Sequence, residues 1–148
     1  MTDYIHDYPP CSYTHVWLRV LHEALDPDDV TQLLGLQPTR IVRVGDRVHE
    51  KSTRTRTNAV WLLESSDAVE SRDSRAHFDW LLDRVGDKGP QLRALAARGY
   101  LVDICCKWDS AAGNGGPTFA PAQLSALGNL GIEVWFDIYF DKEAWDAS

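Results

Sequence analysis

The sequence has little of what marks a secreted or membrane protein. It contains no run of about eighteen apolar residues, which a membrane-spanning helix needs. Its start, MTDYIHDYPPC, lacks the basic and apolar regions of a signal peptide. The three cysteines, Cys11, Cys105 and Cys106, are an odd number without CxxC spacing. These absences predict a cytoplasmic protein with reduced thiols and no membrane contact, in which adjacent Cys105 and Cys106 act as small packing residues.

Sequence motifs that carry catalysis are missing as well. There is no GxSxG or HExxH motif, and Gly113–Gly116 is not followed by the Lys-Ser/Thr pair of a phosphate-binding loop. The histidines are scattered rather than clustered at the spacing of metal ligands. Glu133 and Asp137 would lie about 13 Å apart along one strand, too far for paired glycosidase carboxylates. We expect no enzyme activity, no metal and no cofactor.

The composition that remains is that of one globular domain. Of the 148 residues, 44% are apolar and 25% are charged. The net charge is −7, which argues against binding to double-stranded nucleic acid or to anionic membranes. This charge is uneven, because residues 38–58 hold six basic and two acidic side chains, a net charge of +4 that leaves −11 for the rest.

Apolar periodicity predicts both strands and helices. Strands are expected at residues 16–21, 41–44, 59–64, 100–108 and 132–140, where apolar residues alternate or run together. Helices are expected at residues 26–35, 74–85, 90–98 and 121–130. The first helix has the clearest limits, since Asp26 can cap its start and Gly35 can end it. In the last strand we expect the core face to be formed by Ile132, Val134, Phe136, Ile138 and Phe140.

These elements predict an α+β domain related to the ferredoxin-like folds. Its sheet would be mostly antiparallel, with the helices on one face. Two β-α-β halves would be joined by a helical segment. We expect an irregular N-terminal arm at residues 1–14, the domain at 15–141 and a C-terminal tail at 142–148.

The order of short motifs also resembles a known family. A strand and an acidic-Pro helix start are followed by Leu34-Gly35-Leu36-Gln37-Pro38-Thr39, then by Gly45-Asp46 and Trp61-Leu62-Leu63, and the chain closes with Asp137-Ile138-Tyr139. In this order the sequence resembles a bacterial family of about 140 residues, number four-two-seven-nine in the domain-of-unknown-function series. The resemblance covers about residues 15–141 and implies no activity, cofactor or site residue. Small families of this kind often include immunity proteins against bacterial toxins, which is an analogy.

The basic segment is the first candidate site. Arg43, Arg47, Arg54 and Arg56 could contact an anion or an acidic partner, because guanidinium groups bind carboxylates and phosphates in two-pronged fashion. The alternative is a solvated hairpin loop whose arginines pair with the protein's own acids.

The outer face of the last strand is the second candidate site. Glu133, Trp135, Asp137 and Tyr139 would form an acidic and aromatic surface, which is typical of protein interfaces. The alternative is that helices or the N-terminal arm cover it. We therefore expect a non-catalytic protein-binding module, with an immunity protein against a bacterial toxin as its specific form. A small anionic-ligand-binding domain using the Arg-rich segment 40–56 is the alternative, and the sequence leaves monomer and homodimer open.

Overall fold

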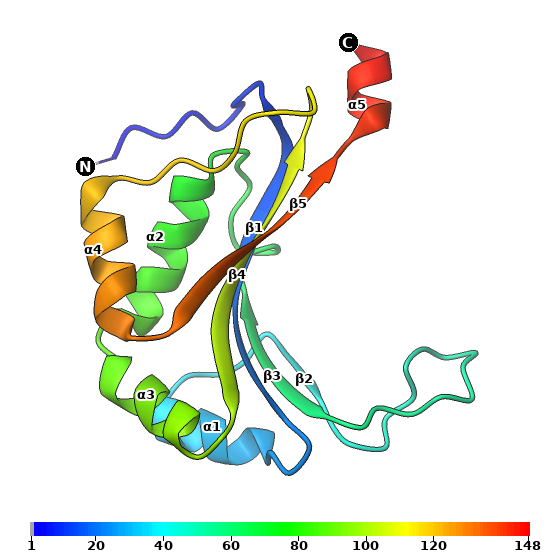
Figure 1. The fold of residues 1–148 in the computed structure, drawn as a ribbon, viewed down its shortest axis with the longest axis vertical. Coiled ribbons are helices and arrows are strands. Elements are labelled where there is room, and N and C mark those ends of the chain that lie inside the picture. The colour runs from blue at the N-terminus through cyan, green and yellow to red at the C-terminus, as the bar shows by residue number, and fades with distance from the viewer. Residues whose placement is uncertain (1) are drawn as a thin grey trace.

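The computed structural model describes residues 2–148 and contains a five-stranded sheet in the order β2-β3-β1-β4-β5 (Figure 1). The strands are β1 (Cys11–His22), β2 (Arg40–Val42), β3 (Ala59–Glu64), β4 (Leu101–Ser110) and β5 (Glu133–Phe140). The helices are α1 (Pro27–Leu34), α2 (Ser74–Val85), α3 (Gly89–Ala97), α4 (Pro121–Leu130) and α5 (Lys142–Ala147). The expected α+β class is confirmed.

The sheet is mixed but mostly antiparallel. The central strand β1 runs antiparallel to β3 and β4, and β2 runs antiparallel to β3. Only β5 lies parallel to its neighbour β4, because α4 carries the chain back between the two strands. The two β-α-β segments therefore differ: β4 and β5 are neighbours, whereas β3 lies between β1 and β2.

The core lies between the sheet and the helices α1 to α4, which cover one face (Figure 1). Val16, Leu18 and Val20 point into it from β1, as their alternation predicts. Trp61 and Trp108 are the largest fully buried side chains. Asp26 caps α1 by accepting from the backbone N–H of Asp28 at 3.0 Å.

One expected boundary is wrong. Strand β1 starts at Cys11, so residues 11–14 are not part of an irregular arm; Thr14 is buried and donates to the carbonyl of Lys107 at 2.7 Å. The polar composition of this segment concealed the continued alternation. The expected C-terminal tail contains α5, whose first turn is capped by Asp141 accepting from the backbone N–H of Ala144 at 3.0 Å.

The expected core face of β5 is also wrong in its second half. Val134 packs against the core, but Phe136, Ile138 and Phe140 are exposed to 41%, 52% and 51%. The strand continues past the layer of helices toward α5 (Figure 1), so these side chains are covered only in part: Phe136 meets Phe119 of the loop before α4 at 6.0 Å between ring centroids.

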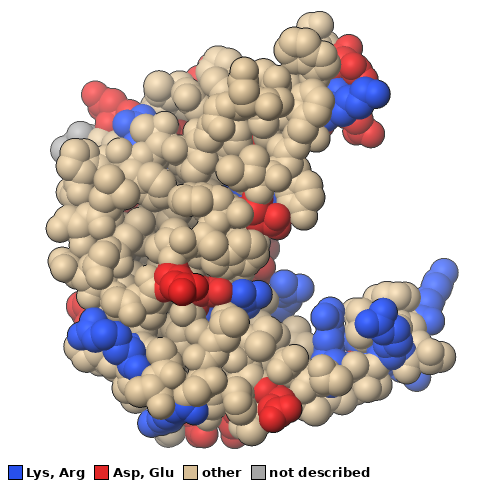
Figure 2. Space-filling view, in the orientation of Figure 1, with Lys and Arg blue, Asp and Glu red and all other residues tan. Residues whose placement is uncertain are grey.

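The segment between β2 and β3 forms a projecting hairpin arm, residues 43–58 (Figure 1). Its two limbs are joined by backbone hydrogen bonds from Gly45 N to Arg56 O at 2.9 Å and from Val48 N to Arg54 O at 3.0 Å. The arm and α5 stand on either side of a hollow and give the molecule the outline of a letter C (Figures 1 and 2). Within residues 2–148, no helix is long and apolar enough to cross a membrane.

Candidate functional site

The sheet face opposite α1 to α4 has no helical cover and looks into the hollow (Figure 1). Because side chains alternate along a strand, this open face carries the residues between the core positions. It consists of Tyr13, His15, Trp17, Arg19 and Leu21 of β1, Arg40 and Val42 of β2, Val60, Leu62 and Glu64 of β3, Leu101, Asp103, Cys105, Lys107 and Asp109 of β4, and Glu133, Trp135, Asp137 and Tyr139 of β5. It is a mixture of aromatic and charged side chains.

A buried ion pair lies at the centre of the open face. Arg19 and Asp103 are opposite each other in the β1–β4 register. Arg19 Nε donates to Asp103 Oδ1 at 3.0 Å, and Arg19 Nη2 donates to Asp103 Oδ2 at 2.7 Å, so the ion pair is bidentate. The Asp103 side chain is only 9% exposed. The positive charge of Arg19 is therefore needed to offset the cost of burying the carboxylate.

Aromatic rings continue outward from this pair. The Arg19 guanidinium lies 5.4 Å from the centroid of the Trp135 ring, and Trp17 meets Trp135 edge-on at 6.4 Å between centroids. Along β1, Trp17 packs on His15 at 5.0 Å, and His15 packs on Tyr13 at 5.3 Å. These ring contacts fix the orientation of the aromatic side chains on the open face.

The four predicted β5 residues lie together on the open face. Trp135 is 36% exposed and Tyr139 is 54% exposed. Asp137 is opposite Lys107 in the register, and the Lys107 ammonium lies 5.2 Å from the centroid of Tyr139. Glu133 is opposite Asp103 at the far end of the strand.

The N-terminal segment does not cover this surface, because it is bound to α2 and the loop before it. Tyr4 donates to Asp79, which raises the pKa of Tyr4 to about 12. The backbone N–H of Ile5 donates to Asp73 at 2.8 Å, and Arg72 donates to the carbonyl of Asp7 at 2.8 Å.

Sequence reasoning missed the β1 half of the open face. Tyr13, His15, Trp17 and Arg19 occupy every second position of one strand. That period-two pattern was a usable signal, because it places an aromatic and cationic row opposite the core positions.

A groove of about 500 Å³ opens where the hairpin arm leaves the sheet. Apolar side chains, including Leu62 and Val60, form its floor, and Trp17 forms part of its wall. Arg40 and Arg56 stand at its rim with Glu64. Arg40 lies 3.5 Å from Glu64, and Arg56 donates to the carbonyl of Val48 at 3.3 Å.

The four predicted arginines are not brought together. Arg43 turns to the helical side, where it lies 3.3 Å from Asp28 and 3.8 Å from Asp26. Arg47 donates to the carbonyl of Glu50 at 3.4 Å, and Arg54 is exposed on the arm. Of the four, only Arg56 lines the groove, where the other arginines are Arg19 of β1 and Arg40 at the start of β2.

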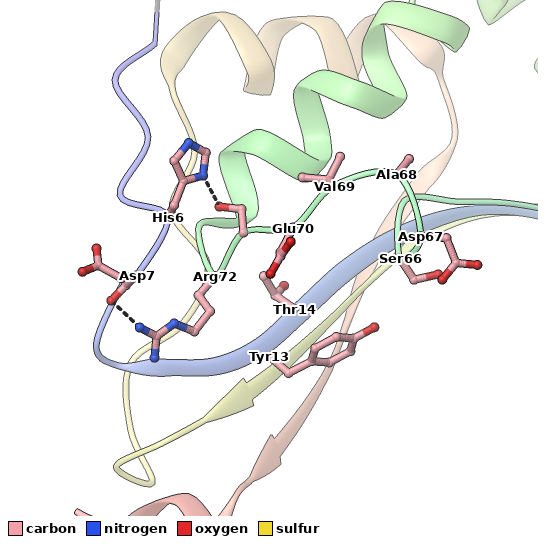
Figure 3. A pocket seen from close by; sticks show the side chains of 11 residues that line it. His6, Asp7, Tyr13, Thr14, Ser66, Asp67, Ala68, Val69, Glu70 and Arg72 are labelled. Atoms are coloured by element: carbon pink, nitrogen blue, oxygen red, sulfur yellow. Dashed lines mark hydrogen bonds between the residues drawn. The ribbon is translucent and has the colours of Figure 1, made fainter.

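A second hollow, of about 840 Å³, lies between the N-terminal segment, the start of β1 and the loop 66–72 (Figure 3). Two pairs of its polar groups are bonded to each other: His6 Nδ1 is 2.9 Å from Ser71 Oγ, and Arg72 donates to the carbonyl of Asp7. The side chains that line it do not converge on a common point (Figure 3). Within residues 2–148, no group of three potential metal ligands is present.

A buried Ser65–His77 pair resembles a nucleophile and its base but is fully used in structural bonds. Ser65 Oγ accepts from the backbone N–H of Val16 at 3.0 Å and lies 2.7 Å from His77 Nδ1. His77 Nε2 lies 2.8 Å from the carbonyl of Ser71, so Nε2 carries the proton and Ser65 donates to Nδ1. Burial lowers the pKa of His77, which keeps the ring neutral.

The cysteines are equally enclosed. All three are free thiols and have no exposed surface. Burial raises the pKa of Cys11 to about 11 and those of Cys105 and Cys106 to about 12. None is a thiolate at neutral pH.

Comparison with known proteins gives one match. The model of a family described as Domain of unknown function (DUF4279) matches residues 12–141. No curated protein and no solved structure matches the chain. The matched span runs from the second residue of β1 to the residue that caps α5, and so contains all of the sheet except Cys11. The chain belongs to the DUF4279 family.

Proposed function

We propose that this chain is a non-catalytic, cytoplasmic protein-binding module whose contact surface is the open face. The observation that carries the proposal is the exposed aromatic surface of Trp135 and Tyr139, held beside Arg19 and Lys107 in a concave sheet. Trp, Tyr and Arg are the residues that contribute most of the binding energy in protein interfaces.

The charges of the open face favour a protein over a polyanion. Arg19 is paired with Asp103, Arg40 with Glu64, and Lys107 with Asp109 at 3.2 Å. These pairs leave no stretch of unmatched positive charge for a phosphate backbone to follow. A surface that combines paired charges with aromatic rings is suited to a protein partner whose surface also combines charged and apolar side chains.

The specific form that we propose is an immunity protein for a cationic bacterial toxin. Its support is the charge outside residues 38–58, which is −11 and would attract a basic partner over long range.

Site-specific crosslinking tests the contact surface. A photo-crosslinking amino acid at Trp135 should capture a defined partner in cells of the source organism, whereas the same amino acid at Leu124 on α4, exposed to 57%, should not. The partner is then purified, and Trp135→Ala with Tyr139→Ala should weaken its binding at least tenfold, while Leu124→Ala leaves binding unchanged. Equal capture at both positions, or unchanged affinity of the double variant, would refute the proposal. Relief of the partner's toxicity by the chain tests the immunity role separately.

A second candidate function is the binding of a small anion in the groove. It is favoured by Arg40 and Arg56, which are exposed and line the groove together with Arg19. A thermal-shift panel of phosphates, nucleotides and acidic metabolites should contain a stabilising ligand. Its effect should disappear in Arg40→Ala with Arg56→Ala and persist in Arg54→Ala, and no shift with any compound would eliminate this candidate.

For the fold, we propose a ferredoxin-like origin of the first four strands. Within the order β2-β3-β1-β4, all neighbours are antiparallel, and β3 splits the β1-α1-β2 unit. Helix α3 extends the second crossover, and α4 with β5 adds to the sheet edge. Superposition of an experimental structure on ferredoxin-like domains tests this relation.

A further inference from the structure

The outer edge of β5 lacks several of the features that usually protect an edge strand, although Glu133 and Asp137 are charged. Within residues 2–148, β5 pairs only with β4, over all eight of its residues and without a register shift. It contains neither lysine nor proline. The opposite edge is different, since β2 has three residues and leads into the hairpin arm. Long, flat and unprotected edges pair readily with another chain.

The same strand concentrates the exposed apolar surface of the molecule. Five of the twelve large hydrophobic side chains that are exposed belong to β5. Trp135 and Tyr139 lie on the open face, while Phe136, Ile138 and Phe140 lie on the helical side beyond the helices. A strand that exposes apolar side chains on both faces and is unpaired along one edge has the properties of one half of an interface.

We propose that β5 pairs antiparallel with β5 of a second copy of this chain, about a two-fold axis at Phe136. Such an axis, perpendicular to the sheet, keeps both helical layers on one side and places each residue opposite one of the same face. The pairing is independent of the protein partner and of the ligand proposed above.

The charges select this register. With the axis at Phe136, Glu133 lies opposite Tyr139 of the second copy, and Asp137 lies opposite Trp135. An axis at Asp137 would place that carboxylate against itself, and an axis at Trp135 would place Glu133 against Asp137. Like charges directly opposite each other destabilise a strand pair, so both alternatives are disfavoured.

Strand length and apolar pairing select the same register. On the helical side, Val134 meets Ile138 of the second copy, and Phe136 meets its own copy on the axis. This register engages almost the whole of β5, whereas an axis at Ile138 would pair only residues 136–140. The result is a continuous ten-stranded sheet in which the two open faces lie side by side.

Analytical ultracentrifugation of the full chain tests for the second copy. We expect a species of twice the 16.7 kDa monomer mass that dissociates on dilution. Ile138→Lys should convert it to monomer, while the matched Leu124→Lys, at an exposed position of α4, should leave it dimeric. Far-UV circular dichroism checks that both variants are folded. A monomer at all concentrations, or a dimer unaffected by Ile138→Lys, would overturn the proposal.

Disulfide trapping tests the register. A cysteine replacing Phe136 would face its own copy at the axis and should form an intermolecular disulfide on mild oxidation. A cysteine replacing Ile138 would face Val134 and should not. The native thiols are buried and do not compete. Crosslinking through position 138 but not through 136 would refute the assigned axis.

Discussion

Replacement of Arg19 by methionine removes the cation that compensates a buried carboxylate. Methionine keeps the aliphatic part of the side chain but leaves Asp103 without its two hydrogen bonds. Breaking a fully buried pair costs about 3–5 kcal/mol. Because the Arg19 side chain is 26% exposed and water reaches its end, we expect a loss of about 2–3 kcal/mol of unfolding free energy. For a domain of this size, that loss lowers the melting temperature by about 5–10 °C.

Urea unfolding followed by circular dichroism measures this loss. Arg40→Met is the matched control, because the Arg40 side chain is 60% exposed and lies 3.5 Å from Glu64, so its loss should cost less than about 0.5 kcal/mol. Arg19→Met combined with Asp103→Leu removes both charges and should be less destabilised than Arg19→Met alone. If Arg19→Met lowers the unfolding free energy no more than Arg40→Met does, the Arg19–Asp103 ion pair does not stabilise the open face.

Three further predictions concern buried groups and a helix cap. Because burial lowers the pKa of His77, the unfolded chain binds more protons below the ordinary value of 6.5. The unfolding free energy should therefore fall as the pH drops from about 7 to 5, and less steeply in His77→Gln; equal slopes in urea titrations would contradict this origin. The enclosed thiols should react with a colorimetric thiol reagent only after denaturation, and rapid reaction of the native chain would show that a cysteine is accessible. Asp26→Ala should cost about 1 kcal/mol through loss of the α1 cap, whereas no change in the urea midpoint would exclude a capping role.

Local patterns were sufficient to predict most elements of the fold. Strand β3 matches the expected residues, and α1 ends at Gly35, whose φ of 66° suits a residue without a side chain. Alternation along β5 separated its two faces correctly. It could not show which face would be covered, because cover depends on where the helices end, and Phe136 and Ile138 lie beyond them.

The candidate site was harder to predict because it is assembled by register. Trp135 was identified from its own strand, but Arg19 and Asp103 meet only because β1 and β4 align them across 84 residues of sequence. No local pattern encodes that alignment. In the same way, Arg43 was grouped with its sequence neighbours, whereas the structure turns it toward the acids at the start of α1.

The central position of β1 has a consequence for synthesis of the chain. This strand leaves the ribosome first, yet both of its partners come later, one beginning at Ala59 and the other at Leu101. Until β4 is made, the nascent chain carries an apolar strand with at least one unsatisfied edge, which is prone to aggregate. Completion of the sheet requires contacts between distant residues, so we expect slow folding that finishes only after β5 is translated.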